Sequence, residues 1–443
     1  MNSITPILIL TASLAAASEE VVVLKVGRAI TAAGEDIEKA IIVMEGGRIK
    51  SIGTAAETPR TARVVEMPQA VAMPGIVDVH SVNGLRVSNE RLANVPYVTV
   101  LDGIDASSPG LENARRHGVT TVHCIAGNVT RFGGQGAVIR TSGRTVDELV
   151  VKSPSAMKMS LQPAAGENRM GNIAALRKSF YDFYTRMKAL QDTGGKVPLV
   201  KKQKLSLTDL VKSRPNWDEI DWKKIPDEKV SEREKPMRDL VQGKLRAFIN
   251  CPTASDVFKA FELIDTHHLD ATLVLGPDAW KLGTVLAARK NLGSVVLNPQ
   301  LEVWERDPGT GGEKRQLTPV LLHKAGISFA LQVVTDSSFN SGPSFGRSGP
   351  YHHWYQAARL VQYGLSRAEA IETITITPAK ILGLDHRIGS LEAGKDANIA
   401  IFSGDPLDAR SWVERLFIEG REVYNRSKDR DLELLLKDPE RSF

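Results

Sequence analysis

Cysteine is almost absent from this chain, and long apolar runs are missing. Two cysteines in 443 residues cannot build a disulfide framework or a four-cysteine zinc site. A membrane-spanning helix needs about 20 apolar residues, and no run in the mature sequence reaches that length. Hydrophobic residues at 42% and charged residues at 25% are ordinary globular values, so a wholly disordered or collagen-like chain is excluded.

A strong excess of one charge is also lacking. The net charge of +5 is mild for this length and does not indicate nucleic-acid binding. Residues 196–246 carry 14 Lys and Arg against 9 Asp and Glu, so this segment accounts for the excess. We expect a solvated helical insertion there; a patch that binds an anionic partner is the alternative.

The first residues have the character of a targeting segment. An apolar run over residues 7–14 is followed by three alanines, although no Lys or Arg precedes the run. We therefore predict a signal peptide at 1–18 and export to the periplasm or the outside. The alternative is a disordered or partly buried tail on a cytoplasmic protein.

Strand patterns occur at both ends of the chain, in residues 19–69 and 385–430. Each end has a hairpin turn signal, at Glu45-Gly46-Gly47 and at Glu419-Gly420. We predict one small β-sandwich domain that is assembled from both ends and followed by a tail at 431–443.

The middle, residues 70–384, alternates apolar strand-like runs with helical patterns. This alternation predicts an α/β fold, a (β/α)8 TIM-type barrel carrying the charged insertion over its mouth. A doubly wound sheet is the alternative, but the first strand lacks the glycine fingerprint of nucleotide binding. The predicted strands are 75–80, 119–126, 156–161, 245–251, 271–276, 294–299 and 327–334.

Several separated motifs agree in order and spacing with one known family. They are MPGIVDVH (73–80), RRHGVTTVHCIAGN (115–128), GGQGAVIRTSGRT (133–145), SFALQVVTDSS (328–338) and the segment 364–408 around EAGKDAN. With these motifs the chain resembles the amidohydrolase superfamily over residues 20–430, and most closely its imidazolonepropionase-like branch.

The resemblance implies hydrolysis of a non-peptide carbon–nitrogen bond with the help of zinc or another divalent metal. Such an ion lowers the pKa of its bound water to about 7 and polarises the carbonyl. Family members place two histidines on the first barrel strand and one on each of the fifth and sixth. An aspartate on the eighth strand completes the set and shuttles a proton.

This sequence departs from that ligand pattern. His80 keeps the first histidine position and Asp336 keeps the aspartate, with its catalytic role. Val82, Asn250 and Leu275 stand at the other three positions. Valine and leucine cannot coordinate a metal, and a neutral amide is a poor zinc ligand, so the resemblance implies a degenerate metal site.

Other residues are candidates for the same pocket. His123 on the second strand is either a third metal ligand with His80 and Asp336 or a core histidine with local hydrogen bonds. Lys158 is expected on the fourth strand, where some superfamily members use a carbamylated lysine as a ligand. We predict substrate binding by Asn250, Lys158 and His352; a surface position at a helix start is the alternative for His352.

Three functions remain open. The first is a metal-dependent hydrolase of a small molecule. The second is a catalytically inactive barrel, without a cofactor, that binds a small molecule or assembles as a homo- or hetero-oligomer with an active amidohydrolase-like chain. The third is a protein that binds anionic surfaces through residues 196–246.

Overall fold

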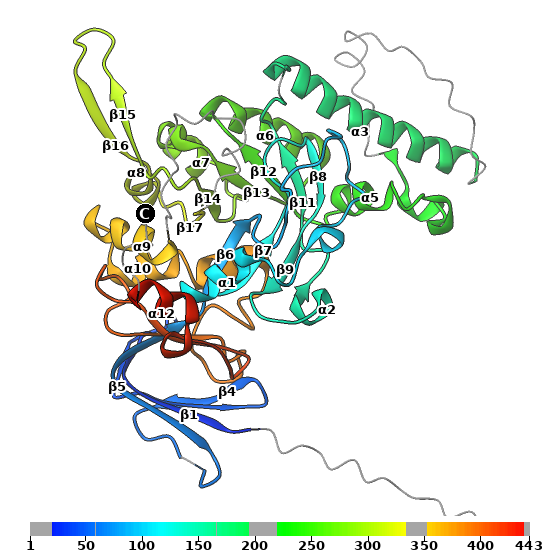
Figure 1. Cartoon of the computed structure of the whole chain (residues 1–443). Helices are drawn as coiled ribbons and strands as arrows, with labels where there is room; N and C mark the ends of the chain where they lie inside the picture. Colours follow the sequence, from blue (N-terminus) through cyan, green and yellow to red (C-terminus); the bar gives the residue numbers. More distant parts are fainter. Residues whose placement is uncertain (1–19, 58, 165, 195–218, 334–351, 438–443) are drawn as a thin grey trace, which may run out of the picture.

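The computed structural model describes five stretches of the chain, which Figure 1 draws in colour. The described residues are 20–57, 59–164, 166–194, 219–333 and 352–437. The predicted signal peptide, residues 196–218 of the insertion and Asp336 lie outside them. Among the described residues, no helix has both the length and the apolar character that a membrane span requires.

Both ends of the chain contribute strands to one eight-stranded sheet (Figure 1). The strand order is β20-β19-β18-β5-β1-β3-β4, with β2 paired to β1. Strand β5 joins the two ends, because it pairs in parallel with β1 and antiparallel with β18. The bounds are β1 (Val22–Ala29), β2 (Ile37–Glu38), β3 (Ile41–Glu45), β4 (Arg48–Gly53), β5 (Arg63–Pro74), β18 (Ile399–Phe402), β19 (Val413–Ile418) and β20 (Arg421–Asn425).

This sheet is curled (Figure 1). At its β4 edge, the N–H of Ile49 donates to the carbonyl of Lys395, at 2.9 Å. The N–H of Ala397 donates to the carbonyl of Gly47, also at 2.9 Å. The edge strand thus meets the segment that leads into β18. Strands from both ends therefore share one hydrogen-bonded sheet, and its packing as a β-sandwich stays a prediction.

A second set of strands forms a mostly parallel ring in the middle of the chain. Strand β6 pairs in parallel with β7, and β11, β12, β13, β14 and β17 follow one another in parallel. These are the seven strands predicted from the sequence. The bounds are β6 (Ile76–Ser81), β7 (Val119–Cys124), β11 (Met157–Ser160), β12 (Ala247–Cys251), β13 (Ala271–Leu275), β14 (Val295–Leu297) and β17 (Phe329–Leu331).

The remaining position in the ring is taken by an antiparallel run. Strand β9 (Ala137–Arg140) is antiparallel to β7, and β8 (Phe132–Gln135) is antiparallel to β11. Together β8 and β9 join the two parallel sets. The ring thus consists of two hydrogen-bonded sheets in which β8 and β9 run against the parallel strands, and a closed (β/α)8 barrel stays a prediction.

The gap between β17 and β6 is bridged by residues 373–374. The N–H of Val77 donates to the carbonyl of Ile374 (3.0 Å), and the N–H of Leu331 donates to the carbonyl of Thr373 (3.3 Å). The next helix, α11 (Ile376–Leu382), adds apolar residues to the cluster inside the ring. Because α11 covers the amino ends of the strands, we expect functional side chains at their carboxyl ends.

The glycine of the first-strand motif has a packing reason. A Cβ atom on Gly75 would lie 2.3 Å from the side chain of Thr120 on β7. Thr120 is itself buried and cannot move into solvent. Gly75 therefore allows β6 and β7 to approach each other at the start of their pairing.

The described half of the charged insertion packs on α3 (Arg169–Asp192), a helix of 24 residues. Trp222 stacks on Phe183 of α3, with 6.3 Å between ring centroids. Arg186 of α3 pairs with Glu234 at 3.2 Å. This half ends in α5 (Lys235–Val241), which leads into β12.

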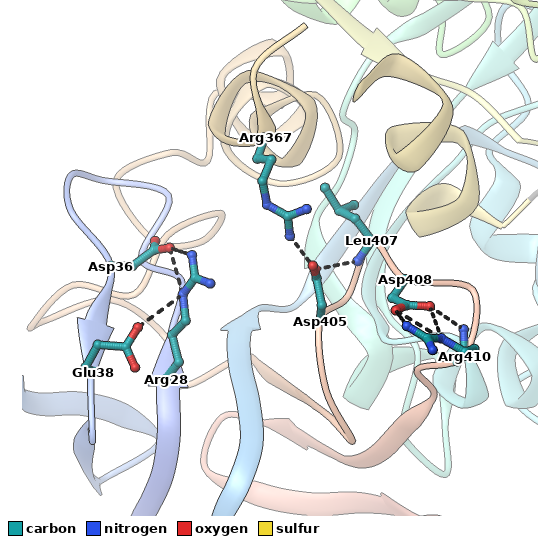
Figure 2. A network of polar contacts seen from close by, with 8 residues as sticks. All are labelled: Arg28, Asp36, Glu38, Arg367, Asp405, Leu407, Asp408 and Arg410. Atoms are coloured by element: carbon teal, nitrogen blue, oxygen red, sulfur yellow. Dashed lines mark hydrogen bonds and ion pairs between the residues drawn. The ribbon is translucent and has the colours of Figure 1, made fainter. Parts of the chain in front are cut away.

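Exposed ion pairs lie at the border between the sheet and the ring (Figure 2). Arg367, at the start of α10 (Arg367–Glu372), pairs with Asp405 in the loop after β18. Asp405 also accepts the N–H of Leu407 at 3.0 Å. Such exposed pairs contribute little to the free energy of unfolding.

Candidate functional site

Buried polar side chains meet inside the ring of strands. His80 lies near the carboxyl end of β6, and Lys158 projects from β11. The Lys158 Nζ atom is 2.5 Å from Nε2 of His80, and it donates to Oδ1 of Asn128 at 2.6 Å. Lys158 is fully buried and His80 is 2% exposed. The sequence-predicted metal ligand and the predicted substrate-binding lysine are thus in direct contact.

A second chain of hydrogen bonds joins Asn250 to this contact. The Nδ2 of Asn250 donates to Oγ of Ser160 at 3.2 Å, and that hydroxyl donates to the carbonyl of Asn128 at 2.5 Å. Asn250 and Ser160 are register partners in the parallel pair β11–β12. We call His80, Asn128, Lys158, Ser160 and Asn250 the interior polar centre.

His123 lies beside this centre but has its own partners. Its Nδ1 is 2.8 Å from the carbonyl of Val79, and its Nε2 is 2.8 Å from Oγ of Ser155. Its ring edge meets Phe248, at 4.7 Å between centroids. Both nitrogens are therefore in use, as expected for the locally hydrogen-bonded core histidine that was the alternative to a metal ligand.

Burial keeps both interior histidines neutral. It lowers the pKa of His80 well below its ordinary value, and the nearby Lys158 lowers that pKa further. Burial also lowers the pKa of His123 to about 4. With Nε2 of His80 accepting from Lys158, the ring proton is at Nδ1. This Nδ1 is buried and has no hydrogen-bond partner among the described residues.

The described residues do not fit a divalent metal ion. Val82 and Leu275 offer no ligand atom, and Nε2 of His80 is already occupied by Lys158. Within the described stretches, no group of three His, Cys, Asp or Glu side chains could hold a metal. A catalytic zinc site normally needs three protein ligands. The described residues alone therefore do not form one.

His352 does not join the interior polar centre. It precedes α9 (His353–Gln362) and stacks on His117, at the end of α1 (Pro109–Arg116), with 3.4 Å between centroids. The next residue, His353, faces Asp78 of β6 at 3.5 Å. The prediction that His352 binds substrate with Lys158 and Asn250 is therefore not supported, and its environment is a contact between helices.

An irregularity in β6 separates Asp78 from His80. Residues two apart on a regular strand share a face, yet Asp78 faces α9 while His80 faces Lys158. The pairing of β6 with β7 shifts register between Asp78 and Ser81. Such bulges re-aim side chains and are frequent beside functional sites.

Sequence reasoning missed Asn128, Ser155 and Ser160. The glycines after β7 carry one signal that could have indicated a crowded site. A Cβ on Gly133 would lie 3.1 Å from Cγ of Lys158, so glycine makes room for the lysine. The two cysteines, Cys124 and Cys251, are buried, and burial raises the pKa of each thiol, as expected for inert core residues.

Comparisons with known proteins point to amidohydrolases and a deaminase as similar proteins. The model of the amidohydrolase family matches residues 314–426. The amidohydrolase tasK of Hapsidospora irregularis is 23% identical over 433 residues, which is 86% of this chain and 39% of that protein. Adenine deaminase 1 of Carboxydothermus hydrogenoformans is 38% identical over 77 residues, 17% of this chain and 12% of that protein. The chain thus spans about two-fifths of the longer match.

A solved structure extends the likeness to nearly the whole chain. The amidohydrolase from Thermotoga maritima MSB8 is 27% identical, with a TM-score of 0.71, and the match covers 91% of this chain and 100% of that one. This match includes both the ring of strands and the sheet built from the two ends. Together these comparisons show that the chain is similar to amidohydrolases, over residues 314–426 by the family model and over most of its length by the solved structure.

Proposed function

We propose that this chain is a hydrolase that acts on a non-peptide carbon–nitrogen bond of a small molecule, in the imidazolonepropionase-like branch of its family and with a degenerate metal site. The contact between Lys158 and His80 carries the proposal. It is a buried pair of polar groups inside the ring of a chain that is similar to amidohydrolases over most of its length.

The two side chains offer donors at two different positions, because Lys158 contacts Nε2 of His80 and the ring proton is on Nδ1 at the other side of the imidazole. Attack of water on an amide or cyclic C–N carbonyl places negative charge on the carbonyl oxygen, and fixed donors stabilise that charge. Lys158 Nζ–H is such a donor, and His80 Nδ1–H would bind a second polar atom of the substrate. Asn250 is linked to Lys158 through Ser160 and Asn128. The resemblance gives the proton transfer to Asp336, which we keep as part of the proposal.

A second candidate is a binding barrel without catalysis. Val82, Asn250 and Leu275 replace three ligand positions together, and His123 has both nitrogens engaged. Such a barrel would hold the small molecule or assemble with an active amidohydrolase-like chain. The greater length of tasK, of which the match covers 39%, is consistent with a barrel that works beside further polypeptide.

Turnover and binding by the full-length protein separate the two candidates. N-acyl amino acids, cyclic amides and aminopurines would be incubated with the protein and analysed by mass spectrometry, with thermal shift as the binding readout. We expect hydrolysis of one class, and a loss of about 10²–10³ in kcat in Lys158→Met, because one donor to the oxyanion is removed. Lys178→Met, an exposed lysine of α3, is the matched control.

Binding without hydrolysis in the wild-type chain would favour the second candidate. Hydrolysis that is equal in wild type and Lys158→Met would reject Lys158 as part of the site. Neither binding nor hydrolysis across the three classes would contradict both candidates for these substrates.

A further inference from the structure

We infer that Lys158 takes the place of a metal ion at His80, so that the interior polar centre binds its ligand through side-chain donors and without a metal. This inference rests on the proposed site and names what replaces the family's ion there. It also names the ligand class, a small molecule that presents a carbonyl or carboxylate oxygen.

The first argument is that two groups cannot share one position. The Nζ atom of Lys158 lies 2.5 Å from Nε2 of His80. A zinc ion on the same lone pair would lie about 2.0–2.1 Å from that nitrogen, so it would overlap with the lysine nitrogen. The lysine and an ion at this nitrogen are therefore mutually exclusive.

The second argument is that the lysine is held in place. Its side chain is fully buried, and its nitrogen also donates to Oδ1 of Asn128 at 2.6 Å. Strands β8 and β12 flank β11 on its two sides. Gly133 of β8 lies so close that even a Cβ there would meet the lysine stem at 3.1 Å. The stem of the lysine is therefore closely packed, and its amine is held by two side-chain partners.

The third argument concerns the other nitrogen of His80. Because Nε2 accepts from the lysine, Nδ1 carries the ring proton and offers no lone pair to a metal. This Nδ1 is buried without a hydrogen-bond partner in the described part of the chain. A buried donor without a partner is costly, and a ligand oxygen would satisfy it.

Zinc binding tests the inference without any activity measurement. The full-length chain would be labelled with ¹⁵N at its nine histidines, and the ring resonances of His80, assigned with His80→Ala, would be followed during titration with zinc chloride. In the wild type we expect one protonated and one acceptor nitrogen that zinc does not perturb. Lys158→Met frees Nε2. In this variant we expect zinc to shift the His80 signals at a concentration at least about tenfold below the highest one that leaves the wild-type signals unchanged.

Metal content gives a second readout that does not need the lysine variant to fold. After zinc supplementation and dialysis, we expect equal and near-zero zinc in the wild type and in His80→Ala. About one ion per chain that is lost in His80→Ala would overturn the inference. So would a folded Lys158→Met whose His80 signals respond to zinc no more readily than those of the wild type or the Lys178→Met control.

These results are independent of turnover. A wild-type chain that hydrolyses nothing but has a zinc-insensitive His80 would contradict the proposed hydrolase and support the inference. A hydrolase whose His80 carries zinc would do the reverse.

Discussion

Two histidines inside the ring of strands, His80 and His123, and two outside it, His267 and His352, are held in different ways; the first three are buried and His352 is half-buried. His80 and His123 have polar partners, namely Lys158, a backbone carbonyl and a serine hydroxyl. His267 and His352 are held by aromatic rings. His267, at the end of α6 (Ala254–His267), stacks on Phe180 at 3.8 Å between centroids, and His352 stacks on His117.

A lowered pKa does not distinguish the two groups. Burial lowers the pKa of His267 to about 3, of His352 to about 4 and of His123 to about 4. The outer residues thus have the same electrostatic signature as the inner ones without a polar site around them. What separates a candidate site from a structural position here is the set of partners, not the titration.

Removal of the Phe180 side chain, which stacks on His267, should give the largest loss of stability. Phe180 is fully buried in α3 and contacts both His267 and Phe132. We expect Phe180→Ala to lower the free energy of unfolding by about 3–5 kcal/mol, because it leaves a cavity in the outer layer. Urea unfolding measures this loss. If the NMR signals of the His80 imidazole stay unchanged in Phe180→Ala, the inner and outer histidines are independent of each other. A shift of these signals would show that they are coupled.

The pH dependence of stability should report the outer group with a smaller effect. His267 has a folded pKa of about 3, below the unfolded value of 6.5. As pH falls below about 6.5, His267 binds a proton in the unfolded state but not in the folded state, so the free energy of unfolding decreases. His267→Phe lacks this penalty.

We therefore expect His267→Phe to gain about 1–2 kcal/mol relative to the wild type between pH 7 and pH 5. Urea unfolding at both pH values measures the difference. A constant difference between the two proteins would mean that His267 is not buried as a neutral ring.

The smallest effect on stability should come from the exposed ion pair between Arg367 and Asp405 (Figure 2). Arg367 and Asp405 have side chains that are 45% and 41% exposed. We expect Arg367→Ala to change the free energy of unfolding by less than about 1 kcal/mol, and less in high salt. Thermal melts at low and high salt test this. A larger, salt-insensitive loss would indicate that this contact, and not apolar packing, holds the sheet to the ring.

Much of the fold could be predicted because apolar runs mark buried strands. All seven predicted strands of the ring are present. The glycine-rich run over β8 and β9 is not among the predicted strands. Those glycines serve close approach: a Cβ on Gly136 would lie 3.0 Å from the carbonyl of Cys124 and from Nε2 of His123. Local propensity cannot predict a strand in which close contacts with neighbouring strands require glycine.

The site was predictable only where a motif gives a position. His80, Lys158 and Asn250 follow from their places on three strands, and the structure brings them into one network. Asn128 and Ser160 act through contacts between segments about 30 residues apart, which periodicity does not encode. His352 was assigned to the pocket because the sequence gives its place after β17 but not the neighbour that it faces.

The sheet built from both ends has a consequence for the order of synthesis. Strand β5 ends at Pro74, and its partner β18 begins at Ile399. At about 5–20 residues per second, the ribosome needs roughly 16–65 s to make the chain between them. During that time one edge of β5 is without its partner, and exposed edges favour association with other chains. The last strands to be made therefore close an edge that has been open since the first strands appeared.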